Sequence, residues 1–106
     1  MLGIYKEAVM SKWLEAYPDM PEWLDKKLDS YGDDDPCDVF AMQKLSPNAW
    51  AMACDRGAYC AGVLANDEYL DNGFFTENVP YTYTNDLGKA MAHYIGLVAE
   101  WEANHA

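Results

Sequence analysis

The stretch that most constrains the fold is residues 47–70, which read PNAWAMACDRGAYCAGVLANDEYL. Almost all of it is apolar or small, and on a helix its few polar positions fall on one stripe. Small residues recur at every fourth position, which gives a ridge that a second helix can approach closely: Ala49, Ala53, Gly57, Ala61 and Ala65. The segment therefore predicts a central, largely buried helix.

The same segment has a second interpretation, a β-hairpin over residues 49–64 that turns at Asp55, Arg56 and Gly57. Alanine is depleted in β-strands, and five alanines would line such a hairpin, which favours the helix. The hairpin, and with it an α+β fold, is the alternative.

Two helices are predicted in the N-terminal third of the chain. Residues 4–17 place apolar side chains at helical spacings with charged side chains on the other face, and Pro18 ends the pattern. Residues 19–32 follow, and Asp19 and Glu22 form a capping-box pattern at their start. Both segments are expected to be short amphipathic helices.

The last helix is predicted over residues 87–103, which carry a broad apolar face. Small residues trace a second ridge on it: Gly88, Ala92, Gly96, Ala99 and Ala103. We expect this ridge to cross that of the central helix closely, and pairing across a homodimer is the alternative use of the same surfaces. With a further helix over residues 36–45, the chain is expected to form one all-α domain, a compact bundle of about five helices over residues 1–106.

An aromatic connector, residues 74–83, precedes the last helix. Phe74, Phe75, Tyr81 and Tyr83 could form a recognition surface, because aromatic side chains concentrate at the centres of protein interfaces. They could instead fold over the open end of the core as a lid. We favour the lid, since large exposed apolar patches are uncommon on small proteins.

The charge of the chain restricts its partners. Eighteen acidic residues stand against seven lysines and arginines, for a net charge of −11. Such a surface repels the phosphates of nucleic acid and of anionic membranes, so we expect neither as a direct partner and expect basic proteins instead. The N-terminus is not that of a signal peptide, and no apolar run reaches the roughly 18 residues that span a bilayer, which predicts a cytoplasmic protein.

Five aspartates lie in residues 29–38, DSYGDDDPCD, which we call the acidic segment. Asp35 suits the N-cap of the helix expected over residues 36–45, and Asp38 suits its first turn. The other three have no such local role. The candidate partner-binding acids are therefore Asp29, Asp33 and Asp34, together with Asp38.

Motifs for catalysis, metal binding or cofactor binding are absent from the sequence. Cys37, Cys54 and Cys60 are odd in number and irregularly spaced, and on a helix Cys54 and Cys60 would point away from each other. They are expected to be buried thiols. His93 falls on the polar face of the last helix and is expected to be solvated. We therefore predict no catalytic residue, no metal, no cofactor and no enzymatic activity.

Three functions remain as hypotheses. The first is a small acidic inhibitor or decoy that binds a basic nucleic-acid-handling protein; in size and acidity the chain resembles phage anti-defence proteins and DNA mimics in general character, without a shared motif. The second is an immunity protein or antitoxin that neutralises a basic toxin. The third is a small-molecule-binding protein or enzyme that uses a pocket near residues 74–83.

Overall fold

The computed structural model describes residues 11–32, 34–66 and 74–105, and these residues form an α+β fold. They contain three α-helices, one short 3-10 helix and a four-stranded antiparallel sheet. The all-α bundle predicted above is therefore wrong. The chain divides into two compact units, Met1–Cys37 and Asp38–Ala106. The expectation of a single domain stays a prediction.

Two helices make up the described part of the first unit. Helix α2, Lys12–Ala16, begins at Ser11, whose Oγ accepts a hydrogen bond of 3.0 Å from the Leu14 amide. The same hydroxyl donates to Oδ1 of Asp25 in α3, Glu22–Asp29, at 2.6 Å. One serine thus caps the first helix and ties it to the second.

The helix predicted over residues 19–32 is confirmed as the shorter α3. Helix α2 lies within the helix predicted over residues 4–17. Residues 4–10 of that prediction lie outside the described part of the chain. The third prediction is wrong. Residues Pro36–Asp38 form a single 3-10 turn, and strand β1, Val39–Ser46, takes the place of the helix expected over residues 36–45.

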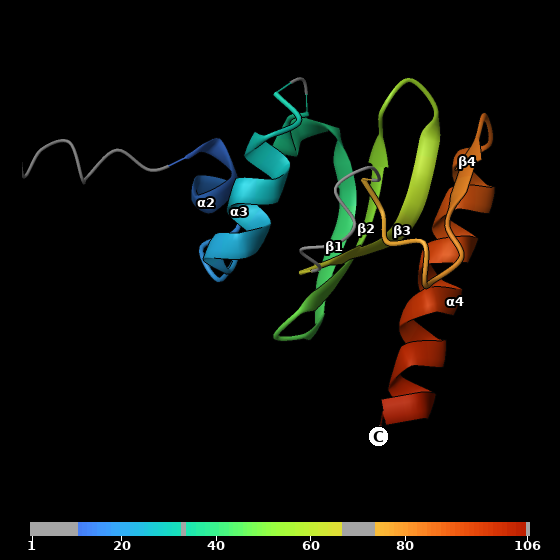
Figure 1. The fold of residues 1–106 in the computed structure, drawn as a ribbon. Helices are drawn as coiled ribbons and strands as arrows, with labels where there is room; N and C mark the ends of the chain where they lie inside the picture. The colour runs from blue at the N-terminus through green and yellow to red at the C-terminus, as the bar shows by residue number, and fades with distance from the viewer. Residues whose placement is uncertain (1–10, 33, 67–73, 106) are drawn as a thin grey trace, which may run out of the picture. The chain divides into compact units, whose positions relative to one another are not determined.

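The second unit is built on a sheet with strand order β1-β2-β3-β4, in which every neighbouring pair is antiparallel (Figure 1). Strands β2, Ala49–Asp55, and β3, Tyr59–Ala65, form a hairpin in the region predicted to be the central helix. The hairpin that we kept as the alternative is therefore what the structure contains. A short strand β4, Thr82–Thr84, completes the sheet.

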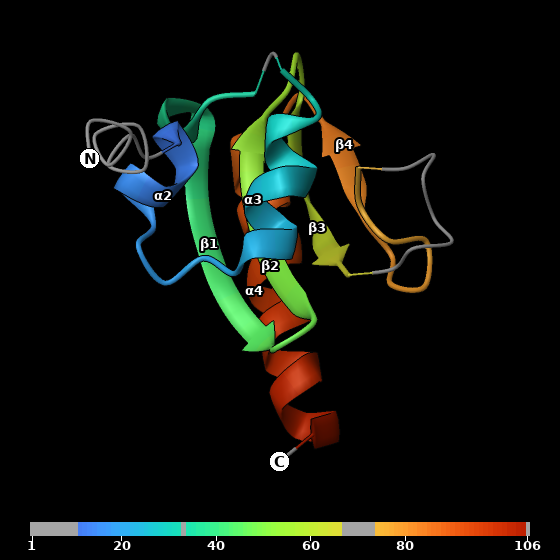
Figure 2. The same ribbon diagram turned by 60° about the vertical axis from the view of Figure 1, so that its left-hand side comes forward.

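Helix α4, Leu87–His105, lies against one face of this sheet (Figure 2). Tyr94 of the helix packs on Ala51, Ala53 and Ala61, and Leu97 packs on Ala49 and Val63. Alternate residues of a strand share a face, so the alanines of β2 form a smooth floor that lets large helix side chains approach closely. Packing by α4 outweighs the low strand propensity of alanine.

The close crossing of two helices predicted from the small-residue ridges is therefore wrong. On α4 the ridge faces outward, and all five of its members are exposed: Gly88, Ala92, Gly96, Ala99 and Ala103. Ile95, beside the ridge, is 62% exposed. Pairing of this ridge across a homodimer stays a prediction.

The opposite face of β2 and β3 carries larger side chains, among them Trp50, Met52 and Leu64, which are all buried. Gly62 lies on this face beneath the connector, where a Cβ atom would come within 2.6 Å of Cγ of Phe75. Because Gly62 has no side chain, the phenyl ring of Phe75 can lie directly against the backbone of β3.

The turn of the hairpin contains Gly57, whose φ angle of 92° lies in a region that favours glycine. Its amide donates to Oδ1 of Asp55 at 3.0 Å. Gly57 therefore serves the turn, and our prediction that it faces a crossing helix is wrong. None of the described helices is both long enough and apolar enough to cross a membrane.

Candidate functional site

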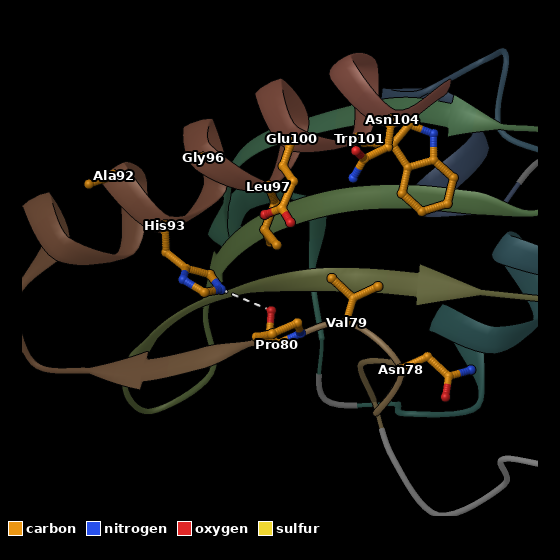
Figure 3. A pocket seen from close by; sticks show the side chains of 10 residues that line it. All are labelled: Asn78, Val79, Pro80, Ala92, His93, Gly96, Leu97, Glu100, Trp101 and Asn104. Carbon is orange, nitrogen blue, oxygen red and sulfur yellow. Dashed lines mark hydrogen bonds between the residues drawn. The ribbon is translucent and has the colours of Figure 1, made fainter. Parts of the chain in front are cut away.

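A groove of about 500 Å³ lies in the second unit, between the Asn78–Pro80 part of the connector and one side of α4 (Figure 3). Residues at every fourth position of the helix line it: Ala92, Gly96, Glu100 and Asn104. Because four residues make about one helical turn, these side chains form a row along the groove. The small residues at 92 and 96 leave that end of the row open.

The larger apolar side chains that line the groove are Leu97 and Trp101 from α4 and Val79 from the connector. They belong to one apolar cluster: Val79 and Trp101 are partly buried and pack against buried Leu97 and its sheet neighbours. The apolar lining is thus continuous with the core beneath α4. A mostly apolar lining of this kind is common in sites that bind other molecules.

His93 joins the connector to the helix. Its Nε2 lies 2.9 Å from the carbonyl oxygen of Pro80 (Figure 3). A carbonyl oxygen only accepts hydrogen bonds, so Nε2 must carry the proton and donate. His93 is half-buried, and its hydrogen bond is exposed to solvent, so the histidine predicted on the polar face also links α4 to the connector.

The groove carries a single formal negative charge. Among the described residues that line it, Glu100 is the one with a charged side chain, and no lysine or arginine lines it. Amide groups of Asn78 and Asn104 supply further polar atoms. An apolar lining beside one carboxylate suits a ligand that combines an apolar group with a cation.

The four aromatic residues of the connector divide into two pairs. Phe74 and Phe75 are buried, with ring centroids 4.9 Å apart, whereas the lid was predicted over a helical core that the structure does not contain. Tyr81 and Tyr83 are 44% and 48% exposed and lie on the surface. The guanidinium of Arg56 connects the pairs, since it lies 3.8 Å from the Phe74 ring centroid and donates to the Tyr83 hydroxyl at 3.4 Å.

Tyr83 is directly opposite Cys60 in the sheet. Partial burial, followed by the nearby Cys60 thiol, raises the pKa of Tyr83 above its ordinary value. Its phenol is therefore neutral at physiological pH and is available as a hydrogen-bonding group rather than as a charge.

The acids predicted to bind a partner are placed in different parts of the chain. Asp29 is exposed at the end of α3, and Asp38 is exposed at the end of the 3-10 turn. Asp34 is only partly exposed, and its backbone carbonyl accepts a hydrogen bond from Nζ of Lys12. Asp33 lies outside the described residues. Asp29 and Asp34 belong to the first unit, whereas Asp38 begins the second.

Asp35 has the local role that the sequence predicted, although in a smaller element. Its Oδ1 accepts a 2.9 Å hydrogen bond from the Cys37 amide and so caps the 3-10 turn rather than an α-helix. This hydrogen bond lowers the pKa of the Asp35 carboxyl below its ordinary value.

The cysteines differ from one another in their surroundings. Cys54 and Cys60 are buried, as predicted, but they face each other across the hairpin, so the prediction that they point apart is wrong. Cys37 is exposed, so its predicted burial is also wrong. Within the described residues, no group of three or more His, Cys, Asp or Glu side chains is arranged to hold a metal ion.

From the sequence a pocket was expected only in the third hypothesis, between the helices and the connector near residues 74–83. The residues of α4 that line the groove were not identified. The available signal was the spacing of His93 and Glu100, which are seven residues apart and therefore on the same side of a helix.

Comparisons of the chain with protein-family models, curated proteins and solved structures found no match.

Proposed function

We propose that this chain is a small acidic protein-binding module, and that the groove on α4 holds a segment of a basic partner. The observation that carries the proposal is the position of Glu100 beside Leu97 and Trp101, in a groove with no lysine or arginine among its described lining residues. A basic segment with one apolar side chain would satisfy both features.

The two features would act at different stages of binding. The net charge of −11 would attract a basic surface and raise the rate of encounter, with an effect that salt screens. The apolar lining would then bury an anchor side chain, which slows dissociation. Acidity that extends over the chain thus favours partners that normally bind nucleic acid, and supports the role of an inhibitor or decoy in the cytoplasm.

A second function is favoured by the volume of the groove. About 500 Å³ lies within the roughly 300–1,000 Å³ range of small-molecule sites, so a small apolar cation could occupy it without any protein partner. An immunity protein or antitoxin for a basic toxin would use the same surface as the decoy, and the identity of the partner separates those two.

The test titrates the isotope-labelled protein with two short peptides, one with a tryptophan between lysines and one with a tryptophan between glutamates, while amide NMR shifts are recorded. The basic peptide should shift amides around His93, Gly96 and Glu100, and the acidic peptide should not. Shifts caused by indole alone, with none added by the flanking lysines, would favour the small-molecule function instead.

Two pairs of variants make the test specific. Ala92→Trp fills the groove, whereas Ala99→Trp adds the same side chain at an exposed alanine of α4 that does not line it. Only the first should abolish binding. Glu100→Gln should weaken binding about two- to fivefold, the range of an exposed ion pair, and Glu102→Gln, outside the groove, should weaken it less. Equal effects within either pair would refute the groove as the binding site.

The acidic segment has a separate test. Changing Asp29, Asp33 and Asp34 together to Asn should slow association with a basic partner most at low ionic strength, because electrostatic steering acts on encounter. An unchanged association rate at low salt would leave the α4 groove as the whole interface.

A further inference from the structure

Two cysteines lie opposite each other at the closed end of the β2–β3 hairpin, buried under the sheet surface. Their Sγ atoms are 3.5 Å apart. We propose that Cys54 and Cys60 are a redox modification site, at which a low-molecular-weight disulfide such as oxidised glutathione converts the two thiols into a disulfide within the chain.

The backbone geometry already suits that bond. Directly opposed residues of an antiparallel pair have Cα atoms about 4.5 or 5.5 Å apart, depending on the hydrogen-bonding position. Both values lie within the roughly 4.4–6.8 Å found across disulfides. Because Cys54 and Cys60 are register partners, rotation of the side chains can bring the sulfurs from 3.5 Å to the bonded distance of about 2.0 Å. No strand has to move.

The present contacts hold the two sulfurs together. Sγ of Cys60 also donates to the backbone carbonyl of Cys54 at 3.3 Å, so this thiol contacts both the sulfur and the carbonyl oxygen of the same residue. A metal ion would need additional ligands, and the described residues offer no such cluster here. The pair is therefore a dithiol, whose characteristic reaction is oxidation to a disulfide.

Access to the buried thiols comes from the end of the hairpin. The pair is separated from the turn at Arg56–Ala58 by only one further residue pair, Asp55 and Tyr59. Opening of such an end costs less free energy than global unfolding. The pair therefore reacts with an oxidant while this end of the hairpin is locally open. Its reaction with any thiol reagent is accordingly slower than that of an exposed cysteine.

The reaction proceeds in two balanced steps. The thiolate of one cysteine attacks a sulfur of oxidised glutathione, which forms a mixed disulfide and releases one glutathione thiolate that takes up the proton lost by the cysteine. The second cysteine loses its proton and attacks the protein sulfur of the mixed disulfide, which releases the second glutathione. The protein loses two protons and two electrons, and one oxidised glutathione becomes two reduced molecules.

The bond would alter the surface above it. Tyr83 is the register partner of Cys60 on β4, and Arg56 in the turn donates to the Tyr83 hydroxyl. A covalent link between β2 and β3 at this position would restrain the hairpin end that carries the Arg56 side chain. Oxidation would therefore reduce the mobility of the surface that Arg56 and Tyr83 form.

The experiment uses the full chain with Cys37→Ser, which removes the exposed thiol and prevents links between chains. The folded protein is equilibrated with a glutathione redox buffer, quenched with acid, alkylated and digested with trypsin. Because Arg56 lies between the two cysteines, cleavage there separates residues 45–56 from residues 57–89. A disulfide keeps these two peptides linked, with a total mass about 2 Da below their sum as thiols.

The linked peptide should predominate, and the ratio of disulfide to dithiol at a given buffer should be at least about tenfold higher in the folded protein than in urea, because the fold raises the effective concentration of one thiol near the other. Cys54→Ala and Cys60→Ala, each in the Cys37→Ser background, should give only glutathione adducts. An equal ratio in the folded and unfolded chains, or adducts without the linked peptide, would overturn the proposal.

Discussion

Replacing Gly62 with alanine tests how the connector is seated on the sheet. The added Cβ would lie 2.6 Å from Cγ of Phe75, 2.8 Å from its Cδ1 and 2.7 Å from Cβ of Tyr81. All three distances are shorter than a van der Waals contact, and Cβ of Tyr81 is attached to the backbone, so it cannot move away by side-chain rotation alone. The connector must shift as a segment.

Two effects of opposite sign set the magnitude. Overpacking a well-packed site costs about 1–3 kcal/mol, whereas replacing glycine with alanine stabilises by about 0.4–1 kcal/mol through the entropy of the unfolded chain. The net expectation is a loss of about 1–2 kcal/mol in the free energy of unfolding, measured by urea titration with tryptophan fluorescence and circular dichroism.

Gly96→Ala is the matched control. Gly96 is an exposed helical position on α4, and a Cβ atom there has nothing within 4 Å. The same substitution should therefore stabilise the protein, by about 0.5–1 kcal/mol from helix propensity. If Gly62→Ala were also neutral or stabilising, the seating of Phe75 on Gly62 would be refuted.

Three further predictions concern single positions. Gly57→Ala should lower the free energy of unfolding by about 1–2 kcal/mol in urea titrations, because φ at this turn is 92° and alanine is strained there. The hydrogen bond from the Cys37 amide lowers the pKa of Asp35, so the carboxylate stabilises the fold above the unfolded-state pKa of about 3.9, and this contribution should fade as the pH falls through the folded-state pKa. Urea midpoints of Asp35→Asn measured from neutral to acidic pH should lack that part of the acid destabilisation. Finally, a thiol reagent should modify Cys37 of the native protein rapidly and Cys54 and Cys60 much more slowly, through local opening of the hairpin end, until denaturant is added; modification of all three at one rate would contradict the burial of Cys54 and Cys60.

Features that depend on local chemistry could be predicted from the amino-acid sequence. Helix α3 and helix α4 were predicted from the spacing of apolar residues, and both are confirmed. The local role of Asp35 followed from the position of its side chain before Pro36. Such signals act over one or two turns of chain, so they can be read without knowing what the segment packs against.

Tertiary structure decided the central segment, because its pattern has two solutions. Residues spaced by four are also spaced by an even number, so Ala49 and Ala53 share one face of a strand as well as of a helix. Ala61, the register partner of Ala53, lies on the same face of the hairpin. The spacing of four therefore fits a helical ridge and a face of a hairpin equally well, and it does not distinguish between the two. The sharp turn at Gly57 and the large side chains of α4, which need a flat floor, select the strand.

The same ambiguity accounts for the site residues that the sequence missed. Cys54 and Cys60 are far apart on a helix and adjacent on a hairpin, so the choice of element decided whether they could meet. The groove depends on contact between the connector and α4 through His93 and Pro80, residues thirteen positions apart. Local patterns determined which segments of this chain are helical at its ends. Only long-range packing determined which side chains face each other, because burial against another element can outweigh the preference of any single residue.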